Sequence, residues 1–261
     1  MFELFQGLRW THIAFGTVAL TLFWIPVIAR KGGRLHVRIG WTYAVCMSVV
    51  VFTAFTMSGL AFAFPLGVRH ITRTLSPEQS AQFIRASRES AYFLFYLAAL
   101  TLAAGWQGIG VLRTRRDPKS LRNPFTYGLN IGVVLAAAGS LTLGIVEHSS
   151  VLVGMSSVGF LVGGGNLTYL LRAPQTKMHW WYEHLGSMIT TAIAGYTAFI
   201  VFGGARLFPA LARTQLYVVF WLLPAAIGVP AILFTVAYYK KKFHEDGPAG
   251  KPEQTQANTA A

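Results

Sequence analysis

The sequence predicts an all-α integral membrane protein, a bundle of about seven transmembrane helices. Of its 261 residues, 54% are hydrophobic and only 12% are charged, whereas a soluble domain usually carries about 25% charged residues. The mean hydropathy is +0.49, and each crossing of the bilayer takes about 20 apolar residues. The chain therefore has room for about six or seven crossings with short connections, and none for a sizeable soluble domain.

Apolar segments bounded by charged residues give the expected transmembrane helices. They run over Thr11–Ala29, Ile39–Phe64, Ser90–Leu112, Thr126–Val146, Ser150–Leu171, Trp180–Phe202 and Leu216–Tyr239. Between the second and third segments, Ser76-Pro77-Glu78-Gln79 has the N-cap, the N1 proline and the glutamine of a capping box. The residues Ala81–Ser90 mix apolar and charged side chains, which predicts an interfacial helix leading into the third segment.

One transmembrane domain, residues 1–242, accounts for nearly the whole chain. After Lys242 the composition changes to Gly, Pro, Gln, Asn, Thr and Ala, which predicts a disordered polar tail over residues 243–261. Small residues gather in the third, fourth and fifth segments. They predict close helix packing, because lipid offers helices no hydrophobic drive to associate.

The basic residues set the expected orientation. The net charge is +13, and under the predicted topology 15 of the 22 Lys and Arg residues fall on one side and 7 on the other. Because Lys and Arg collect on the cytoplasmic side, the N-terminus is expected outside and the C-terminus in the cytoplasm of a cell inner (plasma) membrane. The charge at the helix ends suits membrane lipids as partners and does not call for nucleic acid.

Histidines dominate the short list of ionisable residues near membrane depth, where such groups are costly. The topology places His12, His70 and His148 near the outer face, and His36, His179 and His184 near the cytoplasmic face. Neutral imidazole is a common metal ligand and the axial ligand of b-type haem. The best outer pair is His12 with His70 or His148, and the best inner pair is His184 with His36. The alternative is that these histidines only cap carbonyls or bond neighbouring side chains.

Two further patterns suggest ligands. Glu147-His148 and Glu183-His184 place carboxylates beside imidazoles, so that Glu147 and Glu183 join the histidines, His179 included, as candidate ligands of a transition metal. The first loop combines Gly32-Gly33 with Lys31, Arg34 and Arg38. It predicts a site for a phosphate or carboxylate, such as a lipid headgroup or a haem propionate, at a helix N-terminus. The alternative is a loop that only sets orientation.

Short motifs resemble a known family. Thr11-His12-Ile13-Ala14-Phe15-Gly16, Lys31-Gly32 and His36-Val37-Arg38-Ile39-Gly40-Trp41-Thr42-Tyr43 are similar to the opening of a bacterial family of multi-pass membrane proteins, domain of unknown function 2306. His184-Leu185-Gly186-Ser187-Met188 resembles its closing motif, although His36-x-Arg38 stands here in place of a His-Arg dipeptide. The resemblance implies a membrane location and a helix bundle that carries histidines, without an activity.

The function predicted from the two-sided histidine distribution is binding of haem b or a transition metal, with electron transfer in the membrane and a redox partner or membrane-complex subunit. The alternative is a non-enzymatic transporter, or a membrane assembly or scaffold subunit, with structural histidines. An intramembrane hydrolase with three histidines and an aspartate is disfavoured, because Asp117 and Asp246 lie in a loop and in the tail.

Overall fold

A computed structural model describes residues 1–69, 75–115, 117–172, 176–204 and 217–245. All regular structure in these ranges is helical. The helices are α1 (Phe2–Ile28), α2 (Arg34–Ala63), α3 (Pro77–Thr114), η1 (Pro118–Leu121), α4 (Pro124–Val146), α5 (Ser150–Leu171), α6 (His179–Ala198), η2 (Phe199–Gly204) and α9 (Tyr217–Lys242). In the described part of the chain, 7 helices are long and apolar enough to cross a membrane. The predicted all-helical fold with about seven such helices is confirmed.

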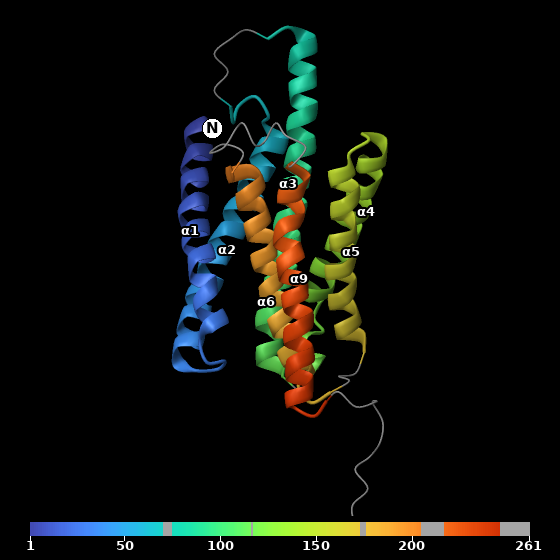
Figure 1. The fold of residues 1–261 in the computed structure, drawn as a ribbon. Helices are drawn as coiled ribbons and strands as arrows, with labels where there is room; N and C mark the ends of the chain where they lie inside the picture. The colour runs from blue at the N-terminus through green and yellow to red at the C-terminus, as the bar shows by residue number, and fades with distance from the viewer. Residues whose placement is uncertain (70–74, 116, 173–175, 205–216, 246–261) are drawn as a thin grey trace, which may run out of the picture.

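The helices run alternately up and down, so that α1 begins at one end of the bundle and α9 ends at the other (Figure 1). α1 packs against α2 on one side and α4 against α5 on the other, while α3 and α6 pack together between these pairs. The connections that follow α1, α3 and α5, and the C-terminal end of α9, share one end of the bundle. We call it the basic end, because it carries Lys31, Arg34, Arg113, Arg115, Lys177 and Lys240.

α3 differs from its prediction. Its N-terminus has the predicted capping box, with the Ser76 hydroxyl accepting from Gln79 N and the Gln79 side chain accepting from Ser76 N. The segment Ala81–Ser90, predicted to lead into the third span, continues into it without a break and forms the first part of α3, which extends beyond the other helices (Figure 1). The physical reason is local: no Gly or Pro interrupts the chain between Pro77 and Gly105, so that nothing ends the helix.

Small residues bring α3, α4 and α5 together. Tyr96 on α3 is 1% exposed, and its hydroxyl donates to Met155 O on α5 at 2.8 Å. A Cβ on Gly159 would collide with the Tyr96 hydroxyl and with Ala137 of α4. The predicted role of small residues in close packing is therefore observed at Gly159, whereas Gly164 and Gly165 face open space.

Buried amide side chains also hold the same three helices together. Asn166 of α5 donates to the side-chain oxygen of Asn130 on α4 at 2.8 Å, and to Ala103 O of α3 at 3.4 Å. Asn130 donates in turn to Thr126 O, one turn earlier on α4, at 2.8 Å. Hydrogen bonds between helices are one of the few forces that favour helix association in lipid.

Candidate functional site

His36 lies in the first turn of α2 at the basic end and is half-buried. Its Nδ1 lies 3.0 Å from Pro26 O of α1, and since a carbonyl only accepts hydrogen bonds, Nδ1 carries the proton and donates. Pro26 belongs to the last turn of α1, whose final carbonyls lack donors within the helix. Lys31 Nζ donates to the same oxygen at 3.0 Å. Two side chains thus satisfy the end of α1, and the bond fixes the orientation of His36.

His184 lies in the second turn of α6 and is also half-buried. Its Nδ1 donates to Gly108 O of α3 at 2.7 Å. This bond needs a close approach of α6 to α3, which the missing side chain of Gly108 permits. A Cβ on Gly108 would lie 3.0 Å from Met188 Sδ and 3.1 Å from Ser187 Cβ. Met188 itself packs against the buried cluster between α1 and α2.

The imidazole rings of His36 and His184 meet edge to face across the N-terminal turns of α2 and α6. Their ring centres are 6.4 Å apart with 69° between the ring planes. In both rings, Nδ1–H donates to a backbone carbonyl. The Nε2 atom of this neutral tautomer has a lone pair that can bind another partner. The structure therefore brings together the inner pair that the sequence singled out, and we call it the histidine pair.

The outer histidines are not assembled in the same way. His12 Nδ1 lies 3.1 Å from Val50 O and 3.0 Å from Thr53 Oγ1, so that it joins α1 to α2. His148 is exposed, and its φ of 51° lets it end α4 in the left-handed region. α1 and the α4–α5 pair lie on opposite sides of the bundle (Figure 1), so His12 and His148 are not brought together. His70 lies outside the described residues.

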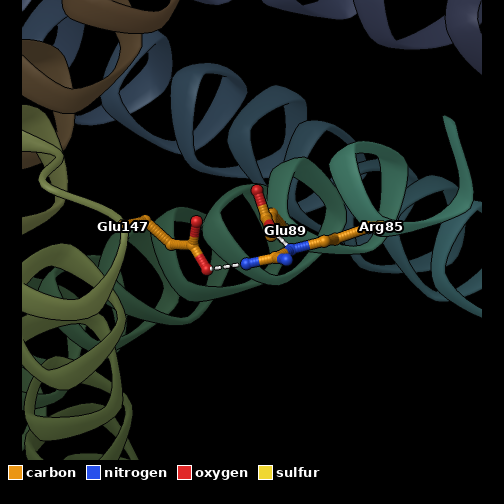
Figure 2. A network of polar contacts seen from close by, with 3 residues as sticks. All are labelled: Arg85, Glu89 and Glu147. Atoms are coloured by element: carbon orange, nitrogen blue, oxygen red, sulfur yellow. Dashed lines mark hydrogen bonds and ion pairs between the residues drawn. The ribbon is translucent and has the colours of Figure 1, made fainter. Parts of the chain in front are cut away.

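Of the two glutamates named with the histidines, Glu147 binds an arginine and Glu183 lies near His179. Arg85 of α3 donates to Glu89 one turn later at 3.0 Å and to Glu147 at the end of α4, as Figure 2 shows. Glu183 Oε1 lies 3.8 Å from His179 Nε2, one turn before it on α6. Glu147 therefore pairs with an arginine of α3 rather than with its neighbour His148. The carboxylate nearest His179 is Glu183.

The first loop carries the basic residues of the predicted anion site, and one of them also bonds to α1. Lys31 Nζ donates to Pro26 O and Val27 O and so caps the end of α1, where a cation is favourable. Partial burial lowers the pKa of the Lys31 ammonium below its ordinary value. Arg34 and Arg38 lie on the first turns of α2 with exposed side chains. Lys31 therefore binds the end of α1, and the exposed Arg34 and Arg38 are open to an anion.

Sequence reasoning missed one residue that shapes this end of the bundle. Glu245, assigned to the disordered tail, accepts from Met178 N at 3.0 Å and from the Tyr182 hydroxyl at 2.8 Å. It thereby caps the N-terminus of α6, which carries His184. The rest of the tail, residues 246–261, lies outside the described residues. No local signal marked Glu245, because its partners lie far away in the sequence.

The donor set limits what the histidine pair can hold. In the described ranges, no group of three or more His, Cys, Asp or Glu side chains lies close enough to hold a metal ion. A closed structural zinc site needs four protein ligands, so these residues do not fit one. Two imidazoles are the kind of side chain that would hold haem iron, or a metal ion that takes its other ligands from outside the protein.

Comparison with known proteins adds no relative: no model of a protein family, no curated protein and no solved structure matches the chain. The resemblance to domain of unknown function 2306 thus stays a prediction.

Proposed function

We propose that this protein is a membrane electron-transfer protein that binds haem iron, or a transition-metal ion, between His36 and His184. The observation that carries the proposal is the histidine pair, with ring centres 6.4 Å apart. His36 and His184 would hold the metal through their Nε2 atoms, and a metal–nitrogen bond is roughly 2 Å long. Two rings as close as these could therefore share one ion.

The hydrogen bonds of the pair support the same proposal. Histidines that bind a metal through one nitrogen usually donate the other ring N–H to a carbonyl or carboxylate, which fixes the tautomer and the ring orientation. Pro26 O and Gly108 O play that part for His36 and His184. Both acceptors belong to helices packed in the bundle, so the two rings are held before any ligand binds. When bound, haem or a redox metal would supply one-electron chemistry.

The test is the absorption spectrum and metal content of the full chain, purified in detergent after expression with haem precursor and trace metals. We expect a Soret band or a stoichiometric metal in the wild type. Both His36→Ala and His184→Ala should lose it. His148→Ala, which removes an exposed imidazole, is the matched control and should keep it. A wild type with neither signal, or a His184→Ala variant that keeps the signal, would refute the proposal.

The alternative, a transporter or an assembly subunit with structural histidines, is favoured by one observation at His12. Its ring joins α1 to α2 through Val50 and Thr53, and nothing in the described part of the chain makes it a ligand. Glutamine at His184 separates the two functions, because its amide can still donate to Gly108 O but is a poor ligand. Under the alternative, His184→Gln keeps both the fold and every spectroscopic property of the wild type.

We propose further that the basic end faces the cytoplasm and the N-terminus lies outside, in the plasma membrane. The excess of Lys and Arg at this end supports the assignment. Glu147 and Lys177 flank α5 and therefore sit at opposite ends of a membrane span. In a Cys46→Ala background, an impermeant thiol reagent on whole cells should label Glu147→Cys and spare Lys177→Cys. The reverse pattern would invert the topology.

A further inference from the structure

A pocket opens at the basic end, apart from the histidine pair. Its volume is about 450 Å³, and it is open to the surroundings rather than enclosed. The last turn of α3, the turn that follows it and the start of α6 form its walls. The lining residues are Arg113, Thr114, Arg115, Asp117, Lys177, Met178 and Trp180.

The charges around this pocket do not balance. The lining includes three cationic side chains, Arg113, Arg115 and Lys177, and one carboxylate, Asp117. The Asp117 carboxylate also caps η1, because its Oδ1 accepts a hydrogen bond from Lys119 N at 3.0 Å. Within the ranges that the structure describes, none of the three cations forms an ion pair. Like charges that share one pocket repel one another, and an anion between them removes the repulsion.

The backbone and an aromatic ring fix one of these cations. Arg115 has a φ of 42°, a left-handed conformation that is uncommon for a residue other than glycine. Its guanidinium carbon lies 5.6 Å from the centre of the Trp180 ring, within the range of a cation–π contact. Trp180 thus forms part of the wall and also positions the Arg115 charge at the pocket.

We propose that this pocket binds a phosphate-bearing anion at the membrane surface. Arginine forks match phosphate oxygens in pairs, and lysine adds a point charge. The pocket lies at the end of α3 and α6, where spanning helices meet the headgroup region, and basic pockets between such helices suit anionic headgroups. The phosphate belongs either to an anionic lipid or to a soluble molecule, and the two sources can be separated by experiment.

The experiment is a binding titration of the full chain in detergent micelles with short-chain phosphatidylglycerol, phosphatidylcholine and inorganic phosphate. Phosphatidylglycerol should bind more tightly than zwitterionic phosphatidylcholine. With about 1 kcal/mol for each basic residue, the double variant Arg113→Gln/Lys177→Gln should bind phosphatidylglycerol roughly 30-fold more weakly. Lys241→Gln removes an exposed charge at the same end, outside the pocket, and should bind like the wild type.

Competition identifies the source of the phosphate. If inorganic phosphate binds the wild type, displaces phosphatidylglycerol and fails to bind the double variant, the ligand is a soluble phosphate. If it does not displace phosphatidylglycerol, the ligand is a lipid headgroup. Arg113→Lys/Lys177→Arg keeps both charges and should retain binding, which guards against a misfolded double variant. The proposal is overturned if neither anion binds, if phosphatidylcholine binds equally, or if the double variant and Lys241→Gln lose the same affinity.

Discussion

Gly108 is the residue at which packing and the histidine pair meet, and its replacement by alanine is the sharpest test of the structure. The Gly108 carbonyl accepts the His184 hydrogen bond at 2.7 Å. An added Cβ would lie 3.0 Å from Met188 Sδ and 3.1 Å from Ser187 Cβ. The methionine can turn aside, but Ser187 Cβ is fixed to the backbone, so α6 must move away from α3 by a few tenths of an ångström.

The cost can be isolated by comparison with Gly105, one turn earlier on α3. There, an added Cβ would lie 3.7 Å from Thr191 Cγ2, an ordinary van der Waals contact. Both substitutions gain the same helix propensity, about 0.5–1 kcal/mol. Only Gly108→Ala adds overpacking, which costs about 1–3 kcal/mol. Gly108→Ala should therefore be about 1–3 kcal/mol less stable than Gly105→Ala, whatever the propensity gain.

The assay is the free energy of unfolding, measured by titrating the protein from a mild detergent into sodium dodecyl sulfate. Helicity by circular dichroism confirms that both variants begin folded. Equal free energies for Gly108→Ala and Gly105→Ala would refute the close approach of α6 to α3, and with it the placement of His184. If the histidine pair binds a metal or haem, Gly108→Ala should also weaken that binding, because it displaces His184 from its carbonyl.

Three other predictions concern polar groups away from the pair. In a double-mutant cycle, Asn130→Ala and Asn166→Ala should be coupled by about 0.6 kcal/mol and by no more than about 1.7 kcal/mol; strictly additive losses would contradict their hydrogen bond. Gln107 is 0% exposed, and neither amide atom has a hydrogen-bond partner in the described part of the chain. Gln107→Leu should therefore leave the free energy of unfolding unchanged or raise it. A lower free energy of unfolding would contradict this. Arg85→Gln should not measurably change that free energy, because its ion pair with Glu147 is exposed; a salt-dependent loss would refute this.

The helices were predictable because each one is a continuous apolar run, and hydrocarbon admits only backbone that satisfies its own hydrogen bonds. The ends were less predictable. α1 begins at Phe2 and α2 at Arg34, whereas the apolar criterion began them at Thr11 and Ile39. A helix continues past the apolar region for as long as nothing breaks it, so composition marks the buried part of a span rather than its termini.

The sequence could predict which histidines lie at a similar depth in the membrane, but not which of them are neighbours. His36 and His184 have similar depth on different helices, and the structure places their rings together. The outer pairing of His12 with His148 also satisfied depth, but it ignored which helices are neighbours, and α1 packs against α2 rather than α4. The depth of a residue in the membrane follows from its position along its own helix. Which helices are neighbours depends on packing between them, and the sequence of one helix does not determine it.

A structural role for the histidines is the alternative to the proposed shared ligand. In lipid, hydrogen bonds between helices favour association, so each imidazole could be retained for its bond to a backbone carbonyl alone. Such bonds are sufficient to explain His12, whose Nδ1 bonds to Val50 and Thr53 of α2. His36 and His184 each hold a different pair of helices, and neither needs the other for its bond. Their rings also meet edge to face, which is an ordinary aromatic contact, and the ligand proposed above for the two Nε2 atoms would add a second reason for this arrangement.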